Sequence, residues 1–274
     1  MAVAAEANPF ANMRIPEINR LGTEALKSAV QIELQERELW DDPEVRWAFD
    51  FSMRMHEHDT RCDGSYQNHL LRTAMWGVRE FDTRNAELAK LLLLHDVVED
   101  HAPEILREFG AGLQLGGPLR DQAIVALSES GQLSRSATVA ALEHISYPSL
   151  EGATSLEHRQ RYARFVSQVT LADPLSAAGK IADRIDNRNG NKYNPNPKLQ
   201  RRLDIKYFVD NHLLREAVYA RGSLIPDHRK DFIDAALVNG HEEAKERLMR
   251  PTPLEPALSG EQVEALTLES LLAA

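Results

Sequence analysis

The sequence predicts an all-α protein, a multi-helical bundle, and three observations lead to this prediction. Apolar residues recur at helical spacing along most of the chain, as in the stripe of Leu70, Ala74, Val78 and Phe81. No segment shows the convincing alternation of apolar and polar residues that marks a half-buried strand. With 274 residues and a hydrophobic content of 43%, the chain is long enough to bury one substantial core.

The periodic segments follow one another in a clear order, with Gly, Pro or Asn between them. Residues 20–38 and 43–57 are expected to form two amphipathic helices. A loop then passes through Asp59, Cys62, Asp63 and Gly64. The next helix is expected at 67–81, with His69 beside its apolar stripe. Further helices are expected at 86–99, 103–109, 119–129, 134–145, 156–170, 174–188, 198–221 and 227–247.

The same pattern indicates one main domain with two terminal segments. Residues 1–41 form an N-terminal extension with a helix, residues 42–247 form the domain, and residues 248–274 form a linker and a C-terminal helix. Three prolines between Arg250 and Pro256 favour an extended linker. Ser259 and Gln262 match a capping box ahead of an apolar run. We expect this last helix to dock on the core or on a partner subunit, so a homo-oligomer stays open.

Composition narrows the possible partners and the compartment. A single cysteine, Cys62, excludes an internal disulfide framework and Cys-rich zinc modules, which favours a reducing compartment. The N-terminus has no basic region followed by a long apolar run, so we expect a soluble, cytoplasmic protein with no membrane partner. The net charge of −10 argues against a general nucleic-acid binder.

One part of the chain carries the opposite charge. Between Gly179 and Lys206, eight basic residues stand against three aspartates, which gives this segment a local charge of +5. Such a segment can focus a small polyanion onto a cleft, or it can be a solvated helix face.

Residues 95–100, His-Asp-Val-Val-Glu-Asp, are the most informative part of the chain. They end an apolar helical stretch that places His95 on the apolar face, where an unpaired imidazole would be poorly solvated. A bound cation would compensate this cost. In a helix Glu99 lies one turn beyond His95 and Asp96, and Asp100 one turn beyond Asp96, so the acidic pair can face what the first pair holds.

Imidazole and carboxylate side chains on three predicted helices form a candidate metal-ligand set. Its members are His69, His95, Asp96 and Asp183. This mixture suits a borderline divalent ion such as manganese, iron or zinc, and four protein ligands leave positions for water on a six-coordinate metal. Asp183 has apolar neighbours, so its carboxylate needs a cation or a salt bridge. A salt bridge to Arg184 is the alternative.

The spaced H…HD…D set resembles the HD-domain metal-dependent phosphohydrolases. Its finer detail is similar to their RelA/SpoT-type branch, which hydrolyses (p)ppGpp and includes small stand-alone hydrolases. The resemblance covers roughly residues 42–220. It depends on three blocks: Arg61 to His69 (RCDGSYQNH), Leu94 to Asp100 (LHDVVED) followed by Phe109-Gly110, and Lys180 to Asn187 (KIADRIDN).

The resemblance implies roles for individual residues. The implied metal ligands, usually for Mn2+, are His69, His95, Asp96 and Asp183. Glu99 and Asp100 match the acidic pair assigned to the attacking water. Arg61 matches an arginine that stacks on the guanine base, and Asn187 matches an asparagine that contacts the nucleotide. Tyr66 matches an aromatic position that we interpret as core packing.

Other substrate contacts are expected from the basic segment. The candidates for stabilising phosphoryl charge are Lys180, Arg184, Arg188 and Lys192. Arg184 is equally well interpreted as the structural anchor of a buried aspartate.

The chain also departs from the family's pattern. Cys62 stands where the family usually has a lysine, and His101 replaces a threonine after the Glu-Asp pair. The family's Thr-Lys after the Phe-Gly segment has no clear counterpart here, and Asp186 and Asn189 also differ. These changes leave the metal chemistry intact and the choice of nucleotide open.

The resulting hypothesis is metal-dependent hydrolysis of the 3′-pyrophosphate of a guanosine polyphosphate. An HD-type phosphatase acting on nucleoside monophosphates or on the 2′-phosphate of NADPH is one alternative. A two-metal enzyme or oxygenase that uses His101, His144 or His158 as extra ligands is another. The third alternative is a catalytically silent nucleotide-binding regulator.

Overall fold

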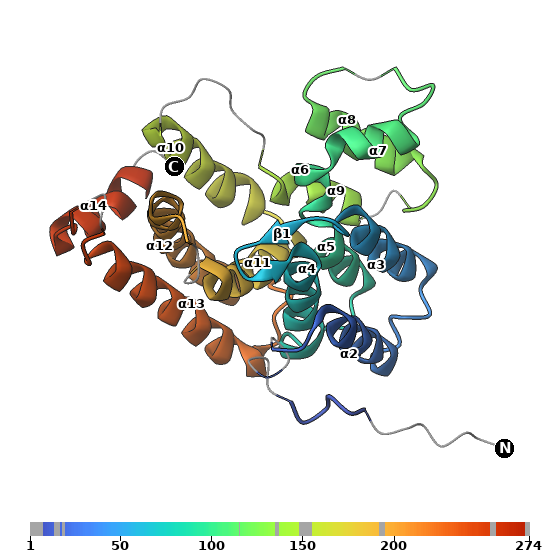
Figure 1. The fold of residues 1–274 in the computed structure, drawn as a ribbon, viewed down its shortest axis with the longest axis horizontal. Coiled ribbons are helices and arrows are strands. Elements are labelled where there is room, and N and C mark those ends of the chain that lie inside the picture. Colours follow the sequence, from blue (N-terminus) through green and yellow to red (C-terminus); the bar gives the residue numbers. More distant parts are fainter. Residues whose placement is uncertain are drawn as a thin grey trace.

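The chain forms a bundle of helices that surround one central helix (Figure 1). The computed structural model describes residues 8–13, 17, 20–114, 116–134, 137–147, 155–191, 195–252 and 256–271. Within these ranges the only sheet is a hairpin of two strands, each two residues long. The predicted all-α fold class is therefore confirmed.

Most of the N-terminal half is helical. Its elements are α2 (Thr23–Glu36), α3 (Pro43–Met55), β1 (Thr60–Arg61), β2 (Gly64–Ser65), α4 (Tyr66–Met75), the π-helical η1 (Trp76–Glu80), α5 (Ala86–Leu94), α6 (Val97–Asp100), α7 (Ala102–Phe109), α8 (Leu119–Glu129) and α9 (Ala137–Ile145).

Longer helices make up the C-terminal half. They are α10 (Ser155–Phe165), the π-helical η2 (Val166–Thr170), α11 (Pro174–Asn191), α12 (Pro197–Tyr219), α13 (Asp227–Leu248) and α14 (Gly260–Leu271).

Capping residues explain where several helices begin. The side chain of Asp42 accepts a hydrogen bond from the backbone N–H of Glu44 at 2.8 Å, and Pro43 opens α3. Asn85 caps α5 and Asn196 caps α12 in the same way. Each cap satisfies backbone donors that the first turn of a helix leaves unpaired. These three helices begin within one residue of their predicted starts.

Two local features differ from the sequence prediction. The expected helix 86–99 is interrupted at His95 and Asp96, which separate α5 from α6. Part of the expected loop after α3 forms the antiparallel hairpin β1–β2, in which Arg61 pairs with Gly64. Gly64 has a φ of +124°, which side-chain-bearing residues rarely adopt. A two-residue strand is too short to show alternation in a sequence.

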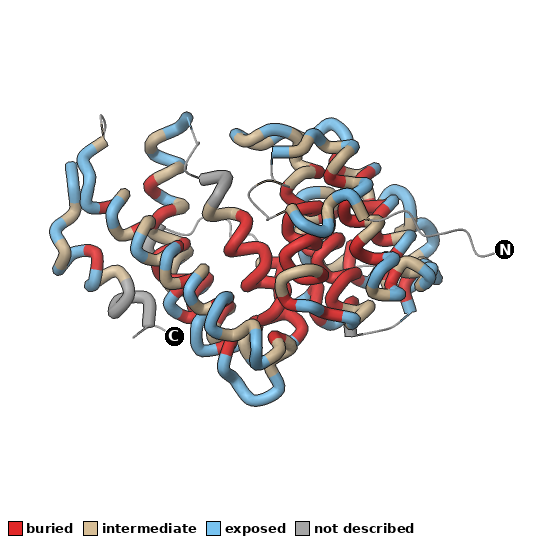
Figure 2. The backbone as a smooth tube through the Cα atoms, turned by 90° about the horizontal axis from the view of Figure 1, so that it is seen from below, coloured by how far each residue is buried: buried red, intermediate tan, exposed pale blue. Residues whose placement is uncertain are grey.

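Helix α11 lies at the centre of the molecule and packs against α4, α5, α9 and α12. Figure 2 shows the buried residues concentrated in the middle of the tube and the exposed residues on its outer turns. Helix α2, although expected to belong to an N-terminal extension, buries Leu26, Val30 and Leu34 in the same core. This core holds the helices that carry the candidate site in fixed positions.

A second, smaller cluster of buried apolar residues joins α10, α12, α13 and α14. Its members are Tyr162, Ala163, Val166, Phe208, Val209, Leu213, Ala244, Leu248 and Val263. Val263 is fully buried, so α14 docks on the core of its own chain. The predicted capping box is present, because Ser259 N–H donates to Gln262 Oε1 at 2.8 Å and Gln262 N–H donates to Ser259 Oγ at 3.2 Å.

Residues 253–255 of the predicted proline-containing linker lie outside the described residues. Among the helices that the structure describes, none has the length and apolar character needed to cross a membrane.

Candidate metal centre and adjoining pocket

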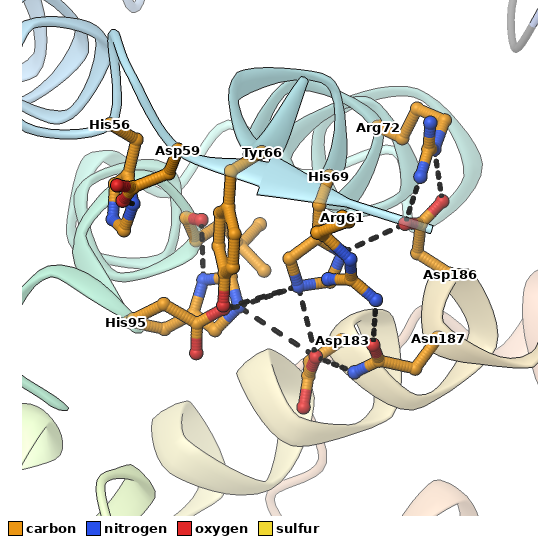
Figure 3. A network of polar contacts seen from close by, with 12 residues as sticks. His56, Asp59, Arg61, Tyr66, His69, Arg72, His95, Asp183, Asp186 and Asn187 are labelled. Carbon is orange, nitrogen blue, oxygen red and sulfur yellow. Dashed lines mark hydrogen bonds and ion pairs between the residues drawn. The ribbon is translucent and has the colours of Figure 1, made fainter. Parts of the chain in front are cut away.

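Three segments bring the four predicted metal ligands together. His69 lies on α4, His95 and Asp96 lie between α5 and α6, and Asp183 lies on α11. His69 Nε2 is 3.4 Å from His95 Nε2, and Asp96 Oδ2 is 3.3 Å from each of these nitrogens. Asp183 Oδ1 is 3.4 Å from His69 Nε2 and 3.7 Å from His95 Nε2. Figure 3 shows the two imidazoles and Asp183 directed toward one another.

In each imidazole, the hydrogen bond made by Nδ1 decides whether Nε2, which faces the cluster, carries a proton. His95 Nδ1 lies 2.9 Å from the carbonyl oxygen of Leu92, which can only accept a hydrogen bond. His69 Nδ1 lies 2.8 Å from the carboxylate of Asp186. Both Nδ1 atoms therefore carry protons, and in neutral rings both Nε2 lone pairs point into the cluster.

A cluster of this kind requires a positive charge at its centre. Although burial lowers the pKa of His95, the charge of Asp96 and a hydrogen bond to Asp183 raise it to about 10. Burial alone would raise the pKa of Asp96 and of Asp183. The two imidazoles, together with Lys180 at Asp183, outweigh this effect and hold the pKa of both carboxyls well below its usual range. Either protons on the imidazoles or a cation between them satisfies this arrangement.

The distances from the two imidazole nitrogens to each other and to the two carboxylates fit a divalent metal. Imidazole nitrogen and carboxylate oxygen bind such ions at about 2.0–2.2 Å, which puts adjacent ligands about 3.0 Å apart in octahedral and about 3.4 Å apart in tetrahedral geometry. The observed 3.3–3.7 Å lies at or slightly above these values. The donor types suit manganese, iron or zinc.

Asp186 holds one of the candidate metal ligands, His69, by the ring nitrogen that faces away from the cluster. Besides accepting from His69, its carboxylate pairs with Arg72, with 2.7 Å between Arg72 Nε and Asp186 Oδ1. Arg72 also contacts Asp63 at 2.6 Å. Asp186 departs from the pattern of the family that the sequence resembles, and it holds the imidazole ring of His69 in place. The sequence signal for it was its position three residues after Asp183 on one helix.

Tyr66 makes a polar contact in addition to its packing. Its hydroxyl donates to Asp96 Oδ2 at 2.8 Å, and its ring stacks on that of His56 at 4.6 Å. The interpretation of Tyr66 as core packing alone is therefore incomplete, since this residue also positions a candidate ligand.

Glu99 and Asp100 occupy the first turn after the His95–Asp96 pair, at the edge of the cluster. Both residues are exposed. Partial loss of water and the negative charge of Asp96 raise the pKa of Glu99, and the same two causes raise that of Asp100 to about 6. Carboxyls with a raised pKa beside a metal-ligand set are suited to general acid–base work.

A cavity of about 850 Å³ adjoins Glu99 at the junction of the two apolar clusters. Apolar walls come from residues such as Tyr147, Leu199 and Leu203. Five basic side chains also line it, namely Arg120, Arg159, Lys180, Arg202 and Lys206. Its size is within the range of small-molecule sites.

Lys180 alone among the predicted phosphate-binding residues with described side chains lines this cavity, where its ammonium lies 3.0 Å from Asp183 Oδ2. Arg184 is buried and pairs with Asp210 at 2.5 Å, with its guanidinium 4.2 Å from the Tyr207 ring centre. Arg184 thus serves as a structural anchor. Arg188 pairs with Glu243 on α13. Lys192 lies outside the described residues.

Arg61 and Asn187 lie next to the metal centre. Arg61 Nη2 donates to Asn187 Oδ1 at 2.6 Å, and Asn187 Nδ2 donates to Asp183 Oδ1 (Figure 3). One face of the Arg61 guanidinium lies over the ring of Tyr66, at 5.3 Å from its centre. The hairpin and the last turns of α11 therefore bring both predicted nucleotide contacts to one edge of the cluster.

Sequence reasoning missed most of the pocket. Arg120 and Arg159 come from α8 and α10, far from the basic segment in sequence. Arg202 and Lys206 belong to the basic segment 179–206, so the positive charge of this segment was the one sequence feature that pointed to them. Of the three histidines considered as extra ligands, His144 and His158 lie away from the four donors, whereas His101 joins a different cluster described below.

Comparison of the chain with protein-family models, with curated proteins and with solved structures gives no significant match.

Proposed function

We propose that this protein is a metal-dependent phosphohydrolase that removes the 3′-pyrophosphate of guanosine polyphosphates, giving GDP or GTP and pyrophosphate. One observation carries the proposal. Two imidazoles and the Asp96 carboxylate form a cluster, with Asp183 Oδ1 at 3.4 and 3.7 Å from the imidazole nitrogens. This cluster lies beside an acidic pair with raised pKa, and Glu99 of this pair lines a cavity that five basic side chains also line.

His69, His95, Asp96 and Asp183 would hold the metal. When bound, a divalent ion supplies Lewis acidity, which lowers the pKa of a water molecule and polarises a phosphoryl oxygen. The chain itself keeps the donors aligned, because Asp186 and the Leu92 carbonyl fix the two imidazoles.

Glu99 and Asp100 provide the proton transfers. Glu99 is the better candidate for the base, because it follows His95 by one turn and lines the cavity in which a substrate phosphate would lie. Asp100, with a pKa of about 6, is close enough to neutrality to accept and return a proton. Their positions next to the ligand set favour hydrolysis at phosphorus over nucleotide binding alone.

The cavity favours a substrate with several phosphates. Lys180 stands beside Asp183, whereas Arg159 and Arg202 line the cavity from α10 and α12. Cations on three helices can neutralise two phosphate groups at separate places. A single monophosphate would leave some of these cations without a partner. The apolar wall, with Tyr147 and Leu199, suits a nucleobase or ribose.

The experiment is an activity panel on the full chain with added Mn2+. The substrates are ppGpp, pppGpp, their adenine analogues, nucleoside monophosphates and NADPH, and the readout is release of pyrophosphate or phosphate. We expect pyrophosphate release from the guanosine polyphosphates. Turnover of monophosphates or NADPH alone would support the phosphatase alternative, and nucleotide binding without turnover under any metal would support the regulator.

A pair of variants sharpens this test. Glu99→Gln is expected to lower kcat by about 100-fold or more while Mn2+ binding persists, because the change removes a proton acceptor and leaves the four donors intact. Glu108→Gln is the matched control, since Glu108 is an exposed carboxylate on α7 that pairs with Arg54. Equal kcat values for the two variants would remove Glu99 from the mechanism.

A further inference from the structure

A second cluster of metal-type donors lies behind Tyr66. His56 Nδ1 and His101 Nε2 each lie 2.8 Å from Asp59 Oδ2, and these two nitrogens are 3.2 Å apart. The ring of His56 is fully buried, His101 is 14% exposed and Asp59 is 37% exposed. Two imidazoles and one carboxylate thus converge on one point that is open to solvent from the Asp59 side.

Hydrogen bonding alone gives this cluster poor geometry. The three distances place the two nitrogens at an angle of about 70° around a single carboxylate oxygen, narrower than the spread of its lone-pair directions. If both nitrogens carried protons, the two hydrogens would crowd against each other. If either lacked its proton, a lone pair would face the carboxylate.

Metal coordination accounts for the same distances. Ligands at about 2.0–2.2 Å from a metal ion are about 2.8–3.1 Å apart at adjacent octahedral positions. Two of the observed separations, both 2.8 Å, lie in this range and the third, 3.2 Å, lies just above it, so the three are close to the edges of one octahedral face. Water can complete the coordination on the exposed side.

We propose that His56, Asp59 and His101 form a second metal site, for a divalent transition metal whose remaining coordination positions are filled by water. Two imidazoles with one carboxylate suit zinc, iron or nickel better than calcium or magnesium, which prefer oxygen ligands. The site is separate from the four-donor centre and shares no ligand with it.

The local fold holds the three ligands in place. His56 ends α3, and Asp59 follows in a tight turn in which its N–H donates to the His56 carbonyl at 3.3 Å. His101 separates α6 from α7 and is held by the 2.9 Å bond from its N–H to the Val97 carbonyl. A metal here would therefore tie the end of α3 to the α6–α7 junction.

This site would act on the first centre through Tyr66. The Tyr66 ring lies parallel to that of His56, at an interplanar angle of 10°, and its hydroxyl donates to Asp96. His101 directly follows Asp100 in the chain. A metal held by His56 and His101 would therefore be connected to the first centre through Tyr66 and through the turn that carries the acidic pair.

Metal counting on the full-length protein tests the proposal. The protein is stripped with a chelator, reloaded with Zn2+, freed of excess metal and measured by elemental analysis. We expect two zinc ions per chain in the wild type and one in both Asp59→Ala and His101→Gln. His58→Ala, which removes an exposed histidine next to the site, should retain two.

Variants of the first centre separate the two sites. Asp183→Asn should lose the first ion and keep the second, and Asp183→Asn combined with His101→Gln should hold none. Circular dichroism checks that each variant is folded. One ion in the wild type, unchanged in His101→Gln, would show that His56, Asp59 and His101 form a hydrogen-bonded cluster only and would overturn the proposal. Because the readout is metal content, it does not depend on catalytic activity.

Discussion

Asp186→Asn is the substitution that tests most directly how the metal centre is built. The Asp186 carboxylate accepts from His69 Nδ1 at 2.8 Å and pairs with Arg72 at 2.7 Å. The asparagine keeps nearly the same shape and removes the negative charge. In the variant, the His69 ring donates to the neutral amide oxygen of the asparagine, which is a weaker acceptor. If the amide nitrogen faces the ring instead, His69 has no acceptor.

The expected loss of metal affinity follows from the role of such partners. Removing the group that orients a ligating imidazole typically weakens metal binding by about 10–100-fold. This corresponds to about 1.4–2.7 kcal/mol of binding free energy. The substitution also leaves the buried Arg72 with one carboxylate partner, Asp63, so we expect a loss of about 1–3 kcal/mol in the free energy of unfolding.

Asp63→Asn is the matched control, because Asp63 contacts Arg72 at 2.6 Å, whereas Asp186 is the carboxylate that accepts from His69 Nδ1. Both variants disturb Arg72, but only Asp186→Asn disturbs the imidazole. Mn2+ affinity is measured by titration with detection of the free ion by electron paramagnetic resonance, and stability by urea unfolding. If the two variants bind Mn2+ with the same affinity, Asp186 does not orient the ligand and the reasoning is refuted.

Three further predictions concern packing, buried charge and pH. A Cβ atom at Gly77 would lie 2.0 Å from Leu92 Cδ1, so Gly77→Ala should destabilise the protein by about 1–3 kcal/mol in urea unfolding, and an unchanged midpoint would contradict this packing. Arg184→Met removes the ion-pair partner of the buried Asp210 and leaves it only the hydrogen bond from the Tyr162 hydroxyl, so it should cost about 3–5 kcal/mol by the same assay. A second change, Asp210→Leu, should restore most of this loss. Burial, with nearby cations, lowers the pKa of Lys206 to about 8, so its positive charge is present below pH 8 and lost above it. Affinity for a guanosine polyphosphate should therefore fall as pH rises through 8 in the wild type and stay level over that step in Lys206→Arg, whose side chain remains charged.

The start of each capped helix could be predicted because the information is local. Asp42, Asn85 and Asn196 satisfy the first backbone donors of the helices that follow them, whatever the rest of the chain does. The two-residue hairpin could not be predicted, because its pairing is too short to leave a pattern in the sequence.

The interruption at His95 and Asp96 shows where local reasoning stops. Periodicity there is continuous, and the sequence predicts one helix through both residues. Both residues nevertheless keep right-handed helical dihedrals, with φ −56° and ψ −36° at His95 and φ −94° and ψ −17° at Asp96. The approach of both donors to within 3.4 Å of His69 Nε2 is therefore decided by the packing of α4 against α5, which no local pattern contains.

The sequence by itself determined the helical fold class and the residue types of the candidate metal centre. Helical periodicity is repeated along the chain, and a histidine and carboxylates on apolar stretches are costly without a partner. Only the tertiary structure decided which basic residues face the cavity. Arg184 and Arg188 turn to Asp210 and Glu243, more than twenty residues away, whereas Arg120 and Arg159 reach the cavity from other helices. Such pairings depend on how distant helices pack, and no short stretch of sequence contains that information.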